Sequence, residues 1–595
     1  MVCSLKASKT KSRVIQKLTI HGKDVTQPED IGNELNEYFA AVGQNLVTLL
    51  LQQNPNWSHN DFQNYLGNSV VDSLFCDPVT ITELSQLIKD LRISKSPGPD
   101  EIGPKLVKLI APMILEPLVH IYNLSFSSGV VPDKLKVAKI VPVFKKGDPS
   151  IPGNYRPISL LSVFDKLLEK LMYSRLYKHL SRNNVLYDFQ FGFRKNHSTA
   201  LALLEVTDSI YQNLDEGNSC CGIYLDLQKA FDTVNHDILL SKLYNYGVRG
   251  IVHHWFQSYL VNRKQYTCVA GTKSNSLNVT CGVPQGSVLG PLLFLIYVND
   301  IGNAVPNEKV KLFADDTNLF VFENSSAALD QKSNFCINEL NKWFIANKLS
   351  LNLTKTCYMV LSCKPCDSFE LRCGQHVIEK VDNYKYLGIV IDSDLKWRLH
   401  IEHVYRKLVK FTSIFFKLRQ KLTDRVLKLI YFAFVHSYIL YGVEIYANTC
   451  FSYLDKLIKL NNKLLRILQN KPRSTPVNEL YRNYETLPAA QLHVYQLCII
   501  VHKFLYHSEM LPPFFRRINY FTLNDQVHNH NVRNKKDLYV HSCRTTSGQR
   551  NTRFKAASIW NNLPPLLKEY SSVSQFKRRL KVYLNDQLTN QSDLI

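Results

Sequence analysis

Lys309-Val-Lys-Leu-Phe-Ala-Asp-Asp-Thr-Asn-Leu-Phe-Val-Phe322 places two adjacent aspartates, Asp315 and Asp316, between two apolar runs. Apolar and β-branched residues on both sides of a short polar tip predict a β-hairpin with both carboxylates at its turn. Carboxylates held this close repel each other and lose solvent, and a bound cation relieves both costs. A solvated turn is the alternative, because aspartate is common in turns.

A second acidic segment favours the cation. Gly222-Ile-Tyr-Leu-Asp-Leu-Gln-Lys-Ala-Phe-Asp232 ends a β-like run at Asp226. One carboxylate at a strand end and two on a hairpin tip can converge on a pair of Mg²⁺ ions, which stabilise the attacking and leaving oxygens of a phosphoryl transfer. Mg²⁺ prefers a few carboxylates plus substrate phosphates, so Asp226, Asp315 and Asp316 suffice as protein ligands. Mn²⁺ is the expected substitute.

Further segments stand in a fixed order around these aspartates. They are residues 138–147 with 154–159, 190–199, 282–291, 343–355 and 386–389. Together with residues 226–232 and 313–316, they resemble the seven motifs of the reverse transcriptases of LINE-type, non-long-terminal-repeat retrotransposons. The resemblance implies an α+β fold, namely a right-hand polymerase with fingers, a palm built on an antiparallel sheet, a helical thumb and a basic C-terminal region.

The resemblance implies contacts with the incoming triphosphate. Lys145 and Arg156 would lie on the fingers, where cations neutralise developing charge. Whether Lys145 or Lys146 points inward stays open. Lys355 would join the three catalytic aspartates by protonating the leaving pyrophosphate, and a plain turn lysine is the alternative.

Three residues are expected beside the nucleotide itself. In the resembling polymerases, the aromatic residue matching Phe231 leaves no room for a 2′-hydroxyl, which would make the product DNA. Viral RNA polymerases usually place an acid at the corresponding spacing, so Phe231 argues against that class. Gly286 would let the backbone approach template and nucleotide closely, and Gln285 offers a hydrogen-bonding amide.

Four residues are expected along the template and primer. Arg194, in Gln190-Phe-Gly-Phe-Arg194, would hold template backbone. Tyr386, Leu387 and Gly388 stand where the family grips the primer end, and a buried strand turn is the alternative.

The positive charge is concentrated in the last third of the chain. The 595 residues carry 72 Lys and Arg against 50 Asp and Glu, a net charge of +22. From Lys396 onward there are 32 basic and 12 acidic residues, so the first 395 residues are nearly neutral. Such asymmetry indicates a polyanionic partner. A solvated basic surface is the alternative.

Composition and patterning predict several units in a large globular protein. Helical patterns are expected at residues 31–51, 77–91 and 160–180, and then at 400–422, 424–447 and 454–469. The predicted division is an N-terminal extension (1–74), fingers with an N-terminal helical part (75–225), a palm (226–392), a thumb (393–475) and a basic C-terminal region (476–595). The reverse transcriptase domain as a whole is expected at about 126–392.

Targeting and metal-binding signals are weak. No signal peptide is visible, and the longest apolar stretch, residues 429–447, contains His436 and Glu444, so no membrane partner is expected. Fourteen cysteines without framework spacing favour an intracellular compartment, nuclear or cytoplasmic. The spacing Cys363-x₂-Cys366-x₆-Cys373-x₂-His376 is short for a zinc ribbon or finger.

The sequence therefore predicts an RNA-directed DNA polymerase that copies element RNA into DNA. Its expected partners are an RNA template, a DNA primer or nicked target DNA, and dNTPs. The nicking endonuclease is expected from elsewhere, because only about 130 residues precede the first motif, without an obvious nuclease constellation. The alternative is a catalytically idle RNA-binding remnant.

Overall fold

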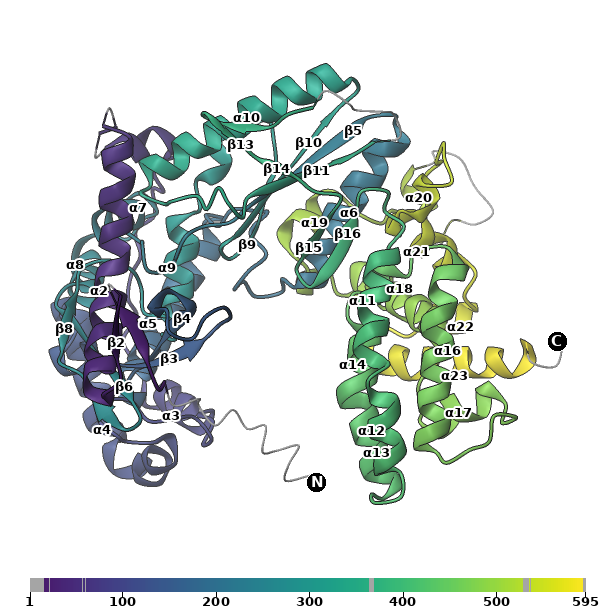
Figure 1. Ribbon diagram of the computed structural model, residues 1–595, viewed down its shortest axis with the longest axis horizontal. Coiled ribbons are helices and arrows are strands. Elements are labelled where there is room, and N and C mark those ends of the chain that lie inside the picture. The colour runs from purple at the N-terminus through teal and green to yellow at the C-terminus, as the bar shows by residue number, and fades with distance from the viewer. Residues whose placement is uncertain are drawn as a thin grey trace.

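The computed structural model describes residues 15–20, 22–55, 57–58, 60–362, 369–527, 535 and 537–591. Its elements form an arch, with a central sheet at the top and two limbs below it (Figure 1). One limb holds the N-terminal helices and a second sheet, and the other holds the helices of the C-terminal third. Helices together with mainly antiparallel sheets confirm the predicted α+β class.

The central sheet joins strands that are far apart in the sequence. Its order is β14-β11-β5-β10-β9, and every pairing is antiparallel except that of β11 with β14. The strands are β5 Ser219–Leu225, β9 Val310–Phe313, β10 Asp316–Glu323, β11 Cys357–Leu361 and β14 Glu379–Lys380. The predicted hairpin of residues 309–322 is confirmed as β9 and β10.

Both faces of the central sheet are buried, because neighbouring residues of a strand point to opposite faces. In β5, Cys221 and Ile223 face the apolar core of the N-terminal limb, whereas Cys220 and Tyr224 face the core of the C-terminal helices. Helix α10 (Ser326–Ala346) contributes to the first core and α6 (Thr199–Asp215) to the second. Burial on both faces explains why these strands read as continuous apolar runs.

The N-terminal limb is built around a second sheet of order β4-β3-β6-β7, with β8 also paired to β6. Its strands are β3 Val137–Phe144, β4 Tyr155–Leu160, β6 Arg263–Val269, β7 Thr272–Lys273 and β8 Leu277–Val279. β3 and β4 form the hairpin of the first motif, and β3 pairs in parallel with β6.

Helices surround this second sheet, and those expected near residues 31–51, 77–91 and 160–180 are confirmed as α2, α3 and α5. The limb contains β1 Leu18–Ile20, β2 Lys23–Val25, α2 Pro28–Gln53, η1 Asp61–Tyr65, α3 Ile81–Lys89, α4 Pro104–Ser128, η2 Asp133–Lys136, η3 Pro152–Asn154, α5 Val163–Arg182, α7 His236–Asn245, α8 Gly250–Leu260, α9 Leu289–Tyr297 and η4 Ile301–Ala304.

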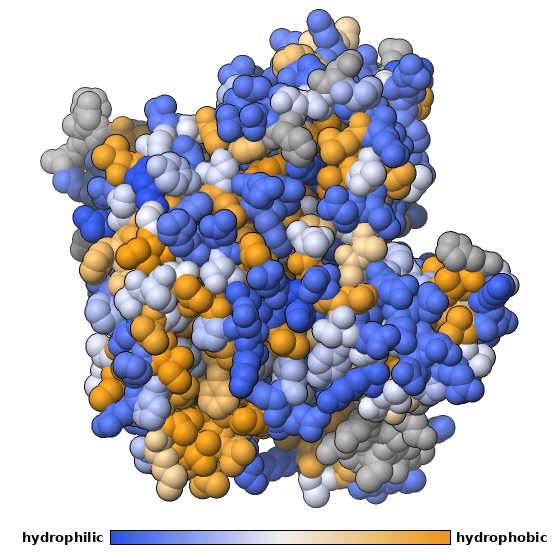
Figure 2. All heavy atoms as spheres, turned by 90° about the vertical axis from the view of Figure 1, so that its left-hand side faces the viewer, coloured by the Kyte–Doolittle hydropathy of each residue, from blue (hydrophilic) through white to orange (hydrophobic). Residues whose placement is uncertain are grey.

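Helix α4 has an exposed apolar side. Within the described ranges it is the one helix long and apolar enough to cross a membrane by length and composition. Leu109 and Met113 are 78% and 82% exposed, and Figure 2 shows apolar side chains gathered at the lower end of this limb's outer face. Tyr122 and Phe126 nevertheless pack α4 into the core of the limb, as in a core helix of a globular protein.

Apart from β14, the chain after β11 forms two small hairpins and then the helices of the C-terminal limb. Its elements are β12 Arg372–Cys373, β13 His376–Val377, β15 Asn383–Tyr386, β16 Ile389–Asp392, α11 Arg398–Leu408, α12 Phe411–Leu418, α13 Asp424–Tyr431, the π-helix η5 Phe432–His436, α14 Ser437–Leu440, α15 Val443–Tyr446, α16 Phe451–Leu468, α17 Val477–Asn483, α18 Ala489–Tyr506, η6 Ser508–Met510, α19 Pro513–Arg517, α20 Asn524–Val527, η7 Gly548–Arg550, α21 Thr552–Asn561, α22 Pro565–Lys568 and α23 Val573–Gln591.

Two of the predicted long helices are interrupted, so the prediction of continuous helices there was wrong. Residues 400–422 divide between α11 and α12. Residues 424–447 break at Gly442, whose φ of +69° suits glycine. A Cβ at Gly442 would also lie 2.6 Å from Cδ1 of Ile389 in β16, so that side chain would have to shift. The predicted helix at 454–469 is confirmed as α16.

The C-terminal region shares one apolar core with the central sheet and α6. The indole Nε1 of Trp397 donates to the Tyr211 hydroxyl of α6 at 3.1 Å, and the Thr552 amide donates to the buried Asp208 carboxylate at 2.9 Å. A chain cut near Lys396 would therefore expose this core.

The cysteines of the described ranges are free thiols. Cys373 and His376 lie in the small β12–β13 hairpin. Cys363 and Cys366, the first two residues of the Cys-Cys-Cys-His spacing, lie outside the described residues.

Candidate active site

Three carboxylates meet at one end of the central sheet. In the register of β5 and β10, Leu225 lies opposite Thr317, so Asp226 and Asp316 follow at the same edge. Asp316 in turn pairs with Phe313 of β9, which leaves Ala314 and Asp315 as the two-residue turn. Ala314 has a φ of +59°, a conformation that tight hairpin turns require.

The three carboxylates repel one another electrostatically. Both hairpin aspartates reach solvent, yet the surrounding protein removes enough water that burial is the first cause of their shifted pKa values. Burial, with repulsion from Asp315 and Asp226, raises the pKa of Asp316 to about 6. Burial also raises the pKa of Asp315, against opposing attraction from Arg156 and Lys145. A cation placed here would relieve the repulsion.

This set of oxygen donors fits a hard divalent cation such as Mg²⁺, which binds a few carboxylates together with substrate phosphates. Over the ranges that the structure describes, no group of three or more His, Cys, Asp and Glu side chains closes around a metal position by itself. Asp226, Asp315 and Asp316 would thus be the protein ligands, and substrate phosphates and water would complete the coordination.

Acidification below about pH 6 is expected to weaken Mg²⁺ binding. The Asp316 carboxylate gains a proton as pH falls through its raised pKa and loses the charge that attracts a cation. The folded chain also binds more protons here than the unfolded chain, whose pKa lies near 3.8. Ionisation of Asp316 therefore lowers the free energy of unfolding as pH rises from about 4 to about 6.

Calorimetric Mg²⁺ titrations between about pH 5 and pH 8 would check this expectation. In Asp316→Asn the titrating carboxylate is gone, so the step near pH 6 should vanish. A native chain with equal Mg²⁺ affinity across that range would contradict the electrostatic account of the site.

Asp226 has two partners from the segment before β11. Lys355 Nζ lies 3.3 Å from Asp226 Oδ2, and the Asn352 side-chain amide donates to the same oxygen at 3.0 Å. The Asn352 backbone amide also donates to the Asp226 carbonyl at 2.8 Å. The structure thus places Lys355 at the site, as the sequence predicted. Asn352, which the sequence reasoning missed, holds Asp226 by one bond to its carboxylate and one to its backbone carbonyl.

The β3–β4 hairpin carries two basic side chains, Lys145 and Arg156, whose charges act on the carboxylates. Burial and the neighbouring Arg156 lower the pKa of Lys145, and Asp226 opposes them, so Lys145 lies within electrostatic reach of the carboxylates. Arg156 lies on β4 opposite Val143, and its charge reaches Asp315.

Lys229, which the sequence reasoning did not single out, ties the hairpin to the strand end beyond Asp226. It donates to the carbonyls of Gly153 and Tyr155 at 3.3 and 3.4 Å.

Phe231 is half-buried between two aromatic rings. It stacks on Phe294 of α9 with centroids 4.5 Å apart, and its ring meets Phe193 edge to face at 6.4 Å. The ring is therefore partly packed in the core and partly open. The same loop carries Asp232, whose burial raises its pKa to about 6.

The loop before α9 lies backbone to backbone against β4. The Ser159 amide donates to the Gln285 carbonyl at 2.8 Å, and the Gln285 side chain donates to Asp232 at 2.8 Å. Gly286 has a φ of +130°, and a Cβ there would lie 2.5 Å from the Ser159 carbonyl oxygen. Glycine is thus required at residue 286 because another backbone segment approaches closely. That segment is β4 of this chain, whereas the sequence predicted template and nucleotide.

The second-motif loop, residues 190–199, packs against the catalytic turn formed by Ala314 and Asp315. The Gln190 side chain accepts from the backbone amides of Ala314 and Gly192 at 3.0 and 2.8 Å. Arg194 is half-buried, and its guanidinium donates to the Tyr187 carbonyl at 2.6 Å. Arg194 is therefore directed at this loop and not at the carboxylates, and its contact with template stays a prediction.

The β15–β16 hairpin places Tyr386, Leu387 and Gly388 close to the site. Tyr386 is buried, and Asp316 is among the charges that act on its pKa, which burial raises. Leu387 and Gly388 form the turn with positive φ values, and the Tyr441 hydroxyl donates to the Leu387 carbonyl. Tyr384, not singled out from sequence, stacks on Tyr224 with centroids 3.8 Å apart.

Comparison with known proteins agrees with this geometry. Residues 143–391 match the family described as reverse transcriptase (RNA-dependent DNA polymerase). The chain is 30% identical over 433 residues to the probable RNA-directed DNA polymerase from transposon BS of Drosophila melanogaster, covering 69% of this chain and 47% of that protein. It is 29% identical over 424 residues to the RNA-directed DNA polymerase from mobile element jockey of the same organism, covering 69% of this chain and 46% of that one. The chain thus spans about half the length of these relatives, and the resemblance to LINE-type reverse transcriptases is confirmed.

Proposed function

Since this chain carries a reverse transcriptase domain of the LINE type, we propose that it is an RNA-directed DNA polymerase that copies element RNA into DNA. The observation that carries the proposal is the convergence of Asp226, Asp315 and Asp316 at one sheet edge, within electrostatic reach of Lys145 and Arg156. A carboxylate cluster facing phosphate-binding cations is what nucleotidyl transfer needs.

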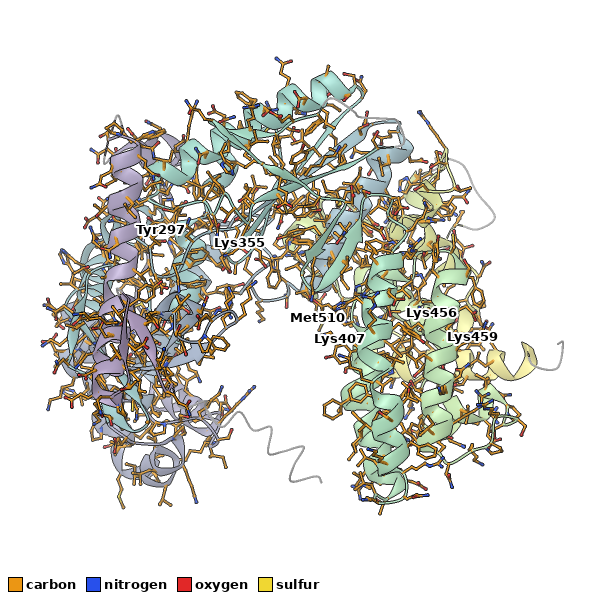
Figure 3. All side chains as sticks on the ribbon, viewed as in Figure 1. Tyr297, Lys355, Lys407, Lys456, Lys459 and Met510 are labelled. Carbon is orange, nitrogen blue, oxygen red and sulfur yellow. The ribbon has the colours of Figure 1, made fainter. Side chains whose placement is uncertain are left out.

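The arch of Figure 1 corresponds, in this proposal, to a right hand. The N-terminal limb supplies the fingers, the central sheet the palm, and the helices from α11 to α16 the thumb. Lys355 lies beneath the central sheet, and Lys407 lies on the side of the helical limb nearer to it (Figure 3). A primed RNA template held between the limbs would bring its primer end to the carboxylates.

Each side chain of the site has a distinct task in this mechanism. Asp226 and Asp315, supported by Asp316, would hold two divalent cations, which when bound supply charge neutralisation and activation of the primer 3′-hydroxyl. Lys145 and Arg156 would bind the triphosphate of the incoming dNTP. Phe231 would exclude the 2′-hydroxyl of a ribonucleotide. Asn352 would hold the Asp226 carboxylate in one orientation.

Lys355 would act as a proton donor to the leaving pyrophosphate, and Lys355→Ala is expected to slow primer extension by roughly 10²- to 10⁴-fold, the usual contribution of a general acid. Lys355→Arg keeps the positive charge near Asp226 but cannot release a proton at accessible pH. The arginine variant should therefore be slow and should lack the alkaline decline in rate that a lysine acid produces.

Single-nucleotide extension rates of the three proteins across the pH range would check this. If Lys355→Ala extends as fast as the native chain, the lysine is a turn residue paired to Asp226 and nothing more.

The proposal is tested most simply by primer extension. A DNA primer annealed to an RNA template is incubated with dNTPs and Mg²⁺, and products are resolved by length. Template-directed extension is expected. A purified, folded chain that binds the primed template but adds no nucleotide would favour the alternative, an idle RNA-binding remnant.

A further inference from the structure

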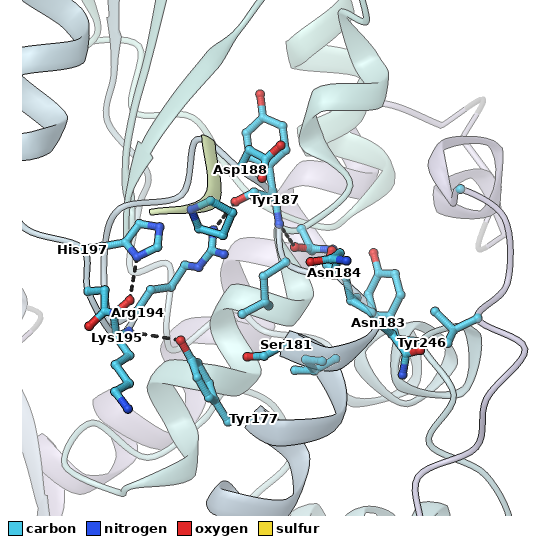
Figure 4. Close-up of a pocket in the computed structure, with 18 of the residues that line it drawn as sticks. Tyr177, Ser181, Asn183, Asn184, Tyr187, Asp188, Arg194, Lys195, His197 and Tyr246 are labelled. Atoms are coloured by element: carbon cyan, nitrogen blue, oxygen red, sulfur yellow. Dashed lines mark hydrogen bonds between the residues drawn. The ribbon is translucent and has the colours of Figure 1, made fainter. Parts of the chain in front are cut away.

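A large polar cavity lies on the other side of the second-motif loop from the catalytic turn. Its volume is about 1210 Å³, and its walls come from the end of α5, the loop of residues 183–197, residues 67–70 and α19 (Figure 4). Segments more than 400 residues apart in sequence therefore form one site, and α19 contributes a wall from the C-terminal region.

Positive charge dominates this cavity. Lys178, Lys195 and Arg516 line it with exposed side chains, and none of the three forms an ion pair with another described residue. Arg517 also lines it and pairs with Asp188. Small-molecule sites are mostly apolar, so this lining suits a polyanion better than a compact ligand.

The cavity wall is preorganised. The Lys195 backbone amide donates to the Tyr177 hydroxyl at 3.1 Å, and His197 Nδ1 lies 2.8 Å from the Lys195 carbonyl oxygen. Arg194 Nε and His197 Nε2 are buried without a hydrogen-bond partner among the described residues. Tyr177 also stacks on Tyr173 with centroids 5.6 Å apart and planes 9° from parallel. A nucleic-acid base could stack on this aromatic surface, while the exposed Lys178 and Lys195 contact its phosphates.

The wall is also the back of the active site. Gln190 and Gly192, at the start of the same loop, contact Ala314 of the catalytic turn, and a Cβ on Gly192 would lie 2.3 Å from the Ala314 nitrogen. The loop that lines the cavity therefore also positions the turn that carries Asp315.

We propose that this cavity binds an unpaired single-stranded nucleic-acid segment, and that Arg516 and Arg517 of the C-terminal region complete it. The proposal rests on the proposed polymerase function, which brings single strands to this part of the molecule. Phosphates would contact Lys178, Lys195 and Arg516, and a base would lie against Tyr177. Unpaired RNA and unpaired DNA share this chemistry.

The test compares two double variants with the same change of charge. Lys195→Glu with Arg516→Glu alters the cavity, and Lys105→Glu with Arg578→Glu alters two exposed cations outside it. Fluorescence anisotropy measures binding of oligouridylate and oligodeoxythymidylate of about 12 nucleotides, and of an RNA duplex of equal length. Circular dichroism melting checks that the variants fold, and Lys178→Glu on α5 serves as an independent cavity variant.

The cavity variant is expected to bind oligouridylate at least roughly tenfold more weakly, with a salt slope smaller by about 1.4 for two lost phosphate contacts. Loss with both oligonucleotides indicates backbone recognition, and loss with RNA alone assigns the cavity to RNA. Duplex affinity should stay within about twofold. Equal single-strand binding by the cavity and control variants, or an equal loss of duplex binding, would overturn the proposal. No dNTPs are present, so absent polymerase activity would appear only in the extension assay of the native chain.

Discussion

Asp315→Asn is expected to reduce primer extension by at least roughly a thousandfold, because losing a metal-binding charge removes several kcal/mol of transition-state stabilisation. Asparagine has nearly the same volume as aspartate and is accepted in tight turns, so the β9–β10 hairpin should persist. Single-turnover extension on a primed RNA template measures the change.

Asp394→Asn is the matched control, since Asp394 is also an exposed aspartate near a hairpin but pairs with Lys396 away from the carboxylate cluster. RNA affinity should be nearly unchanged in both variants, because the substituted group contacts metal and not the RNA backbone. Undiminished extension by Asp315→Asn would refute the assignment of the site.

Phe231→Ala is expected to lower discrimination against ribonucleotides by roughly 10- to 200-fold, the range over which a change of pocket volume acts. Removing the ring opens the space where a 2′-hydroxyl would clash, while Asp226 and the hairpin stay in place. The ratio of dNTP to rNTP kcat/KM on the same primed template measures the effect.

Because Phe231 also stacks on Phe294, the alanine variant loses packing. Phe231→Leu, which refills part of that volume, is the companion variant and should discriminate better than alanine. If Phe231→Ala extends with dNTPs and still rejects rNTPs as the native chain does, the ring is packing alone.

The local signals in the sequence were strong enough to predict the site's centre. The two apolar runs that flank Asp315 and Asp316 predicted a hairpin, and the run ending at Asp226 predicted a further strand. The register of β5 against β10 then brings the three carboxylates together. The sequence indicated the two strands, but their register comes from the fold, because strands that are apolar on both faces do not specify it by pattern.

Contacts made across the fold could not be predicted in this way. Asn352 and Lys229 act through backbone carbonyls and one carboxylate oxygen, and no residue pattern specifies such partners. No sequence pattern predicted that α2 packs against the site. A Cβ at its Gly43 would lie 2.0 Å from the Asp232 carbonyl, so the N-terminal extension is fitted directly against the site.

The C-terminal limb contains a helix break that apolar periodicity did not predict. The helical pattern over residues 424–447 predicted one helix, but the backbone breaks at Gly442, whose φ is +69° and which lies close to Ile389 of β16. Counting residues located the excess of basic residues in the last third of the chain. It did not predict which of these residues lie together on one surface. Arg516 and Arg517 reach the polar cavity only because α19 folds back onto the loop around Asp188.

The claim that Asp226, Asp315 and Asp316 jointly hold the catalytic cations is tested most directly by metal-directed backbone cleavage. Fe²⁺ is substituted for Mg²⁺ in the native chain with primed RNA template and dNTP, and ascorbate with peroxide generates radicals at the bound metal. Cleavage is predicted near residues 225–227 and 314–317, and it should disappear in Asp315→Asn. Cleavage confined to other segments, in a preparation that extends the primer with Mg²⁺, would contradict the account.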